Sequence, residues 1–551
     1  MPPPPDKVVV ECGAVQEILF QDNDLLYLRS VNYRLRGQII LHIQPRRNRR
    51  QLAVNRHDGR SWGAERVLEL PEEIGATLLL RVSFTARGAE IGVLQEDELV
   101  AVLPFEPCAG QHGIAELERA PSILLRLPET PARPEAPPPL DLSASLVAGQ
   151  RLLLQGRIDD PDGQVLALRP EQAGWLGPPL TLLPAREAEA GTPGRPLLAV
   201  GELDASTPPP RWLSLALADG TARRLPLPPA LPAALETLQH WLGLACPAPE
   251  QIAPVFSRLL GPPLRALHAE LAARPLAREE LRLGQPPEAP RASLVIPLYG
   301  RLDFMAFQAA LFSQGGVAAD ELIYVLDNPA QAAEAAQLAR SVQARFGLPL
   351  RLLLPGRRQG FGGASNLGLA AARGRHVCFL NSDAFPADTG WLDRLVGDLE
   401  ADAQLGVVGA RLLFANGTLQ HDGMWFVAQP DFAGWPFPRH LGKGLLPPPA
   451  EPDLVDVPAV TGACMALRRE VAVALGGFDP GYVIGDFEDA DLCQRVLARG
   501  LRCRIDRAAR LWHLERQSQG SGAEPWRMNL TLLNAATFAG RWQEHIETAH
   551  G

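Results

Sequence analysis

A period-two alternation of apolar and polar residues runs through the first part of the chain. Residues 8–127 contain runs such as QIILHIQ, RQLAVNR and TLLLRVSF. This pattern is typical of antiparallel strands that bury one face and expose the other. The sequence therefore predicts an N-terminal antiparallel β-sandwich over residues 1–127.

Two changes of pattern divide the next part of the chain. Residues 128–139 read PETPARPEAPPP, and their prolines predict an extended, semi-rigid linker. Strand-like runs such as RLLLQGRI then predict a second, small β domain over residues 140–228. Helical spacing follows, for example in PLRALHAELAARPLAREELRL, and predicts a helical connector over residues 229–288.

Four apolar runs, SLVIPLYG, ELIYVLDN, LRLLLPG and HVCFLNSD, alternate with helix-like segments after residue 291. This alternation predicts a Rossmann-like α/β domain with a parallel sheet over residues 289–520. An amphipathic helix is expected over residues 521–551. Polar residues and glycines follow each predicted strand, at the edge where open α/β sheets bind ligands.

Composition narrows the class of protein. Apolar residues make up 46% of the 551 residues and charged residues 21%, which is ordinary for globular domains. The net charge of −9 argues against a nucleic-acid partner, because such proteins need a basic face.

The chain carries no recognisable targeting pattern. MPPPPDKVVVE lacks the basic and apolar regions of a secretory signal, and no run of about 18 apolar residues predicts a transmembrane segment. The seven cysteines are scattered and form no CxxC pair, so neither a disulfide framework nor a zinc site is expected. We expect a cytoplasmic protein.

A carboxylate, Asp383, directly follows one predicted strand. An Asp in this position often caps a helix or forms a turn. However, the motifs GFGGASNLG, NSD, VTGACMALRR, GDFEDADLCQRVLARG and LWHLER occur in one order along the chain. This ordered set resembles the family 2 glycosyltransferases with a GT-A fold, particularly the rhamnosyltransferase-like branch, over residues 291 to about 518.

The resemblance implies a divalent metal, Mg²⁺ or Mn²⁺, that binds the diphosphate of the donor. Asp383 matches the last acid of the DxD motif, and Asn381 stands at its first position. Such cations take few protein carboxylates when phosphate oxygens complete their shell. His513 matches the histidine that completes the metal site, although a structural histidine near a strand end remains the alternative.

The resemblance also implies residues that bind the nucleotide sugar. Pro297 and Tyr299 would line the crevice, and Asp327 would recognise the base. Asn366 matches the asparagine of the glycine-rich segment that precedes the strand ending at Asp383. Two interpretations stay open for Arg357 and Arg358: their guanidinium groups could pair with the diphosphate, or they could be exposed to solvent.

Four acids, Asp486, Glu488, Asp489 and Asp491, precede a predicted amphipathic helix. Acids in a first turn stabilise the helix dipole, and this explains some of them. In the family resembled, the second acid of the Glu-Asp pair takes the proton from the acceptor hydroxyl. Asp489 then matches the catalytic base and Glu488 the neighbouring acceptor-binding acid. A base is needed because an alcohol is a poor nucleophile at neutral pH.

These residues together predict an inverting, metal-dependent glycosyltransferase of polysaccharide biosynthesis that uses a nucleotide-diphosphate sugar. The main alternative is a non-catalytic glycan-binding protein with a degenerate GT-A domain. A nucleotidyltransferase is disfavoured because SLVIPLYGR is not followed by a glycine-rich phosphate loop. His421 and Asp422, in TLQHDGMW, also resemble the rhamnosyltransferase-like branch, but no role is assigned to them.

Residues 41–66, LHIQPRRNRRQLAVNRHDGRSWGAER, resemble the carbohydrate-recognition signature of galectins. The matching positions are His42, Gln44, Arg46, Asn55, Trp62 and Glu65, where Gln44 replaces the usual Asn. The resemblance implies a galectin-like sandwich that packs an aromatic ring on galactose and hydrogen-bonds its hydroxyls. It suggests that a β-galactoside acceptor is held there, although a structural tryptophan with solvated neighbours is the simpler alternative.

Overall fold

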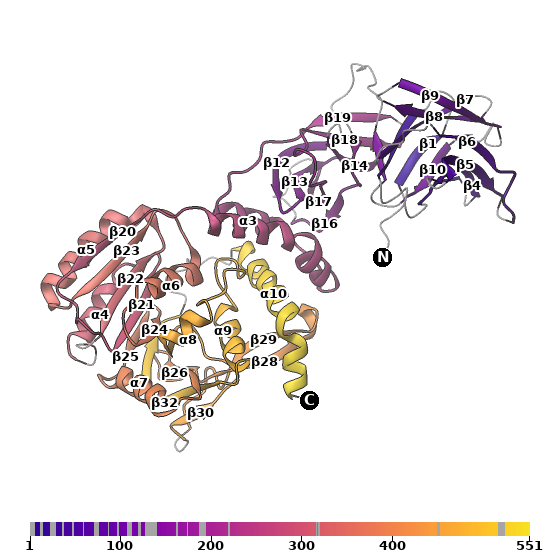
Figure 1. Cartoon of the computed structure of the whole chain (residues 1–551). Helices are drawn as coiled ribbons and strands as arrows, with labels where there is room; N and C mark the ends of the chain where they lie inside the picture. Colours follow the sequence, from indigo (N-terminus) through magenta and orange to yellow (C-terminus); the bar gives the residue numbers. More distant parts are fainter. Residues whose placement is uncertain are drawn as a thin grey trace. The chain divides into compact units, whose positions relative to one another are not determined.

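A computed structural model of the chain divides it into two units, residues 1–231 and 232–551, which we call unit 1 and unit 2 and describe separately. It describes residues 6–10, 15–21, 29–35, 38–46, 49–58, 60–70, 77–85, 88–95, 98–106, 113–119, 123–126, 140–160, 163–172, 175–186, 194–218, 221–315, 317, 320–448, 452–515 and 524–550. Figure 1 labels the elements.

Antiparallel sheets build the described part of unit 1. One has the order β1 (Asp6–Val10), β10 (Gly113–Glu118), β3 (Val31–Leu35), β4 (Gln38–Arg46), β5 (Gln51–His57) and β6 (Arg66–Glu69). Its neighbours pair antiparallel, as the period-two pattern predicts.

A second sheet spans the predicted boundary between the two β domains. Its order is β19 (Ala222–Pro226), β18 (Trp212–Leu217), β14 (Val165–Gln172), β15 (Trp175–Leu176), β11 (Leu124–Arg126), β2 (Val15–Gln21), β7 (Thr77–Thr85), β8 (Gly88–Gln95) and β9 (Glu98–Phe105). The predicted linker, residues 128–139, lies outside the described residues. β11 pairs with β15 beyond it, so the sheet is continuous across the boundary.

Two hydrophobic cores nevertheless lie among the described residues of unit 1. One contains Ile18, Tyr33 and Leu80, from strands of the first two sheets. The other contains Leu152 and Leu213 and packs a further sheet onto β14 and β18. This further sheet has the order β12 (Leu140–Ala148), β13 (Arg151–Ile158), β17 (Arg195–Glu202) and β16 (Thr181–Leu183). The galectin-like fold and the finer domain boundaries stay predictions.

A mixed sheet forms the centre of unit 2. Its order is β20 (Arg278–Leu283), β23 (Leu350–Pro355), β22 (Glu321–Leu326), β21 (Ala292–Leu298), β24 (His376–Leu380), β31 (Cys464–Arg468), β26 (Leu405–Leu413), β32 (Arg502–His513) and β25 (Ala384–Pro386); β27 (Leu419–His421) pairs with β26 and β30 (Leu454–Asp456) with β32. The four predicted strands, β21 to β24, are confirmed and pair in parallel. The sheet is mixed beyond these strands, because β31 joins β24 antiparallel.

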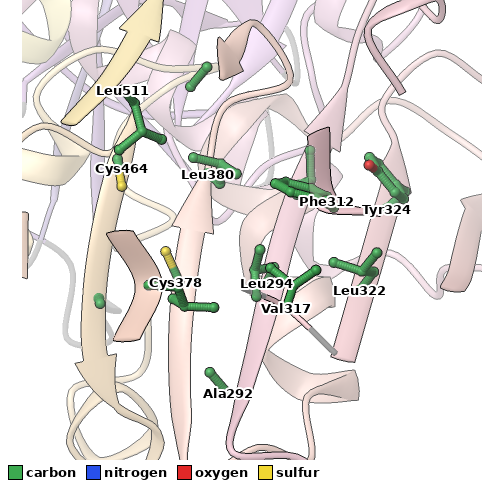
Figure 2. Close-up of a cluster of buried hydrophobic side chains, with 14 of the residues drawn as sticks. Ala292, Leu294, Phe312, Val317, Leu322, Tyr324, Cys378, Leu380, Cys464 and Leu511 are labelled. Atoms are coloured by element: carbon green, nitrogen blue, oxygen red, sulfur yellow. The ribbon is translucent and has the colours of Figure 1, made fainter. Parts of the chain in front are cut away.

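Helices cover both faces of this sheet. α4 (Phe304–Phe312), α5 (Ala332–Phe346), which follows η5 (Pro329–Gln331), and α7 (Trp391–Ala401) pack on one face, and α6 (Gly360–Ala371) packs on the other. Figure 2 shows Phe312 of α4 between Leu380 and Tyr324 of the central strands. Strands buried on both faces explain the continuous apolar runs in the sequence.

The predicted helical connector is helical only in its first part. It forms α2 (Leu235–Leu244), η3 (Pro249–Gln251), η4 (Pro254–Leu259) and α3 (Gly261–Ala273). The prediction of helix through residue 283 is wrong, because Arg278–Leu283 form β20 at the edge of the sheet. Leu281 and Leu283 alternate toward the core, and Glu280 binds Arg351 of β23 at 2.6 Å.

The remaining elements lie near the C-terminal end of the chain. They are β28 (Met424–Gln429), η6 (Pro430–Phe432), β29 (Trp435–His440), α8 (Arg469–Ala474), α9 (Glu488–Leu497) and α10 (Pro525–His550). In Figure 1 the long helix α10 runs beside β29, and it also contacts α2. Among the described helices, none combines the length and apolarity needed to cross a bilayer.

Candidate active site

A cavity of about 440 Å³ opens at the carboxyl ends of β21, β22 and β23. Tyr299, Asn328 and Arg358 line it from the loops after these strands, and Glu488 lines it from the start of α9. Helices α2 and α3 close another side through residues such as Leu235 and Leu271. Its size suits a small-molecule site.

Two side chains of the cavity wall stack. The Arg358 guanidinium lies 4.4 Å from the centre of the Tyr299 ring. Its buried Nε has no hydrogen-bond partner within the described part of the chain, and the nearest carboxylate, that of Asp327, is 3.8 Å away. Such an orphaned donor indicates a missing partner, since buried polar groups are normally paired.

Arg357 makes contacts that neither sequence interpretation predicted. Its Nη1 donates to the carbonyl of Pro275 at 2.9 Å, and its Nη2 donates to those of Leu271 at 2.8 Å and Arg274 at 2.7 Å. These carbonyls end α3. Arg357 therefore fixes the connector to the loop after β23, and it also lines the cavity.

Asp327 follows β22, as predicted, and holds the start of α6. Its Oδ1 accepts the backbone N–H of Gln359 at 2.5 Å and that of Gly360 at 3.1 Å. Burial raises the pKa of Asp327 to about 6, while these N–H groups and Arg358 act in the opposite direction. Its neighbours Asn328 and Arg358 reach the cavity wall, so its role toward a base stays a prediction.

The other residues predicted to bind the nucleotide sugar lie close to these strand ends. Pro297 is in β21, two residues before Tyr299. The amide of Asn366 on α6 is occupied at both ends by the backbone of Phe478, donating at 2.7 Å and accepting at 2.9 Å. Asn366 therefore links α6 to the segment before α9, and its role toward the nucleotide sugar stays a prediction.

Asp383 and His513, far apart in sequence, form one buried pair. His513 Nε2 lies 3.3 Å from Asp383 Oδ1, because β25 and β32 pair at Ala384 and His513. The Oε1 of Gln420 lies 3.1 Å from His513 Nδ1, and Nδ2 of Asn381 lies 3.3 Å from Nε2. A proton on Nδ1 satisfies both contacts and leaves Nε2 with a lone pair.

These residues fit a hard divalent cation. A cation between Asp383 and His513 would take the Nε2 lone pair that the Asn381 N–H contacts here, and the Gln420 contact orients the ring as metal-bound histidines usually are. Across the residues described, no group of three or more His, Cys, Asp or Glu side chains could hold a metal. Donor phosphates would have to complete the shell, as they commonly do for Mg²⁺.

Glu488 and Asp489 begin α9, as the sequence predicts, and their environments differ. The Oδ2 of Asp489 accepts the N–H of Gly462 at 2.9 Å, and its Oδ1 accepts that of Ala490 at 2.7 Å. The buried Oε2 of Glu488 has no partner in the described structure.

This difference in hydrogen bonding gives the two acids different pKa values. Burial raises the pKa of Glu488 well above its usual value, and the charges of Asp489 and Asp486 add to the rise. Burial also raises the pKa of Asp489, but the N–H groups of Gly462 and Ala490 oppose the rise by stabilising the carboxylate. Asp489 is therefore the better candidate for an ionised base, with Glu488 protonated beside it.

One short loop contacts both pairs of residues. Gly462 donates its N–H to Asp489. The carbonyl of the following residue, Ala463, accepts the N–H of Asn381 at 2.9 Å. The N–H of Thr461 donates to His421 Nε2 at 3.3 Å. Asp489 and the Asn381–Asp383 turn therefore flank the same loop rather than opposite surfaces.

The sequence reading missed Gln420 and His421 as supports of this site. His421 is fully buried, and its Nδ1 lies 2.8 Å from Nδ1 of His440. Burial lowers the pKa of His421 well below its usual value, with the charge of His440 as the next cause. The motif TLQHDGMW was the available signal, and only the tertiary contacts give it a role.

The predicted sugar-binding residues of unit 1 also lie together. His42, Gln44 and Arg46 alternate on one face of β4, and His42 pairs with Asn55 across to β5. The Trp62 ring is 51% exposed and lies 5.0 Å from the His42 ring, centre to centre.

Polar groups surround this exposed ring. Arg46 donates two hydrogen bonds to Glu65, at 2.9 Å and 2.6 Å. The buried Oδ1 of Asn55 has no hydrogen-bond partner in the part of the chain that the structure describes. Burial lowers the pKa of His42, which favours the neutral ring. We call the face of His42, Gln44, Arg46, Asn55, Trp62 and Glu65 the Trp62 face.

Residues 293–475 match the family model described as Glycosyl transferase family 2. The chain is 32% identical over 238 residues to the O-antigen biosynthesis protein RfbC of Myxococcus xanthus, which covers 43% of this chain and 18% of that protein. It is 28% identical over 204 residues to the uncharacterized protein y4gI of Sinorhizobium fredii (strain NBRC 101917 / NGR234), covering 36% and 21%. The chain thus spans about a fifth of the length of these curated relatives.

Solved structures also align with the chain. GalNAc-T7 with UDP, GalNAc and Mn²⁺ aligns at a TM-score of 0.38 and 18% identity, covering 46% of this chain and 49% of its own. The mannosyltransferase PcManGT from Pyrobaculum calidifontis, in complex with GDP-Man and Mn²⁺, aligns at 0.30 and 16%, covering 57% and 85%. The rhamnosyltransferase-like branch stays a prediction.

Proposed function

We propose that the family 2 glycosyltransferase domain at residues 293–475, together with the segments that follow it, transfers a sugar from a nucleotide-diphosphate donor to a glycan hydroxyl with inversion. The observation that carries the proposal is the divided acid pair. Asp489 is held as a carboxylate by two N–H groups, while Glu488 keeps an unpartnered oxygen beside the cavity.

In this proposal the nucleotide part of the donor lies in the cavity. The Tyr299 ring would stack on the base, and Asn328 and Arg358 offer hydrogen-bonding groups. Arg358 Nε would gain the partner that it lacks among the described residues. Asp327 would act through the N–H groups and guanidinium that it orients.

Asp489 would accept the proton of the acceptor hydroxyl. As the O–H bond breaks, the acceptor oxygen forms a bond to the anomeric carbon, and the bond from that carbon to the diphosphate breaks. Glu488, protonated, would donate a hydrogen bond to an acceptor hydroxyl. Asp383 and His513 would hold a divalent cation, which when bound balances the negative charge of the leaving diphosphate.

A panel of UDP-, GDP- and dTDP-sugars with Mn²⁺ tests this function. We expect product from at least one donor, and a loss of about 10²- to 10⁴-fold in kcat for Asp489→Asn. Titration with the nucleotide diphosphate should give the same Kd for both proteins. Glu470→Gln, at an exposed acid of α8, is the matched control. If the folded wild-type protein transfers sugar from none of these donors, or if Asp489→Asn is equally active, the alternative of a non-catalytic glycan-binding protein is favoured.

For unit 1 the Trp62 face supports a second function, the binding of a galactose-containing glycan. The exposed ring offers an apolar platform, and Asn55 Oδ1 offers an acceptor for a sugar hydroxyl. Because both units belong to one chain, a glycan held there would reach the transferase at an effective concentration on the order of millimolar. A lower KM for galactosylated acceptors than for acceptors lacking galactose would support this, and equal KM values would oppose it.

A further inference from the structure

The segment that leads into Glu488 has an unfavourable backbone. Ile484, Asp486 and Phe487 have φ values of 60°, 82° and 71°, in the left-handed region. Residues other than glycine adopt this region at a cost of order 1–3 kcal/mol each, and they remain there only where their surroundings hold them. The segment Val483–Phe487 therefore depends on contacts from elsewhere in unit 2.

Asn534 of α10 supplies the main contacts. Its Oδ1 accepts the N–H of Val483 at 2.9 Å, and its Nδ2 donates to the carbonyls of Val483 at 3.0 Å and Gly485 at 2.5 Å. The side chain is fully buried. A carboxamide is required, because the contact needs one acceptor and two donors on a short side chain.

The same helix holds both sides of the acid pair. Thr531 Oγ1 donates to Asp486 Oδ2 at 2.7 Å. Beyond the pair, the buried carboxylate of Asp491 accepts from Arg541 at 2.7 Å and from Trp542 Nε1 at 2.8 Å. Helix α10 thus contacts the chain before Glu488 and after Asp489.

The held segment is also part of the cavity wall. Ile484, Gly485 and Glu488 line the cavity, and the carbonyl of Ile484 accepts the N–H of Phe361 at 2.9 Å. A Cβ at Gly360 would lie 2.4 Å from that carbonyl oxygen, so the segment packs tightly against α6. A shift of this segment would move the acid pair relative to the cavity.

We infer that Asn534 is a positioning residue for the proposed transferase, acting through Val483–Phe487 to place Glu488 at the cavity and Asp489 next to it. The inference rests on the proposed function and extends the site to α10, which lies beyond the family match at residues 293–475. Misplacement of a reacting group by about 1 Å can cost on the order of 10²-fold in rate. The residues proposed to bind the nucleotide, Tyr299, Asn328 and Arg358, lie on the loops after β21, β22 and β23. Within the described structure none of them hydrogen-bonds to Asn534, so Asn534 should affect turnover more than nucleotide affinity.

The test compares Asn534→Ala and Asn534→Asp with Gln543→Ala, whose amide on α10 donates to Glu547. Asn534→Asp keeps the size but loses both donors, so it should behave like Asn534→Ala. We expect amide hydrogen exchange in residues 483–490 to rise about tenfold or more in both, with β21–β24 unchanged. We also expect kcat to fall about ten- to 100-fold, with the Kd of the nucleotide diphosphate within about threefold. Gln543→Ala should match the wild type.

Thr531→Val is a milder variant that should shift exchange and kcat in the same direction, and it keeps the test decisive if the Asn534 variants fold poorly. Unchanged exchange in residues 483–490, or equal losses in kcat and nucleotide affinity, would overturn the inference. If the wild type transfers no sugar from any donor, the proposed function fails, whereas the exchange data still decide whether Asn534 holds this segment.

Discussion

The imidazole of His513 lies 3.3 Å from the carboxylate of Asp383, measured from Nε2 to Oδ1. The register of β25 and β32, which places His513 opposite Ala384, fixes this approach in the backbone. Gln420 Oε1, at 3.1 Å from Nδ1, fixes the ring. Both the position and the tautomer of His513 are thus set by residues outside the pair.

This arrangement predicts that Gln420→Leu weakens the use of a metal without removing a ligand. Loss of the partner of Nδ1 allows the ring to rotate and lowers its basicity, which for comparable partners costs about 10- to 100-fold in metal affinity. The Mn²⁺ concentration for half-maximal transfer should rise by that factor, and His513→Ala should raise it further. Gln404→Leu, at an exposed loop position, is the control. The same Mn²⁺ dependence in Gln420→Leu and wild type would contradict the role of Gln420.

Much of unit 2 follows from the sequence because its central strands are buried on both faces and form unbroken apolar runs. The end of β24 also placed Asp383 correctly at the carboxyl edge. The contacts of Gln420, Arg357 and Asn534 did not follow, because each depends on where a distant backbone segment lies. Residues 278–283 were misread because helical and alternating spacing coincide over so short a run.

Arg357→Ala tests whether the connector is part of the donor site. The substitution leaves three carbonyls at the end of α3 without their charged donor. Because two of these contacts are exposed to water, we expect a loss of about 1 kcal/mol in the free energy of unfolding. Because α3 lines the cavity, we expect a several-fold rise in the KM for the donor as well as a lower Tm. The control is Arg340→Ala, on the exposed face of α5. A lower Tm with an unchanged donor KM would limit Arg357 to a structural role.

Gly462→Ala should damage turnover through close packing. A Cβ at Gly462 would lie 3.1 Å from the Phe361 ring and 3.5 Å from Cβ of Asp489. The distance to Asp489 is ordinary, whereas the distance to the ring is shorter than most Cβ contacts in proteins. The loop must move to relieve this, and its N–H bond to Asp489 lengthens. We expect kcat to fall about tenfold or more with a small change in Tm. Gly397→Ala is the control, because the added atom has no neighbour within 4 Å and Gly397, like Gly462, has no positive φ.

The carboxyl of Asp398 on α7 predicts a pH-dependent stability. Burial raises its pKa to about 6, and the charge of Asp506 adds to the rise. An acid whose pKa is higher in the folded state favours folding at low pH, and that contribution is lost as pH rises from about 4 through 6. Asp398→Asn should therefore stabilise the protein at pH 8 but not at pH 4.5.

The size of this effect is modest because Asp398 is only half-buried. A shift of about two pKa units corresponds to roughly 3 kcal/mol, which solvent screening reduces to about 1 kcal/mol in the free energy of unfolding. Thermal unfolding at the two pH values measures it. Glu400→Gln, an exposed acid on the same helix, should show no such difference. An equal gain in Tm at both pH values for Asp398→Asn would show that the cause is not this titration.

Trp62→Ala tests the sugar-binding function of unit 1. The ring is the most exposed part of the Trp62 face and lies beside His42, so it is the natural platform for the apolar side of a galactose ring. Titration of the full chain with lactose should show binding that Trp62→Ala weakens by about tenfold or more, because stacking of this kind contributes about 1–2 kcal/mol. Trp212→Ala is a matched control, since Trp212 is 39% exposed on β18 but is covered by Arg224 at 4.6 Å. Glucose disaccharides that lack galactose should bind neither protein. Lactose binding that survives Trp62→Ala, or that Trp212→Ala weakens equally, would move the site away from the Trp62 face.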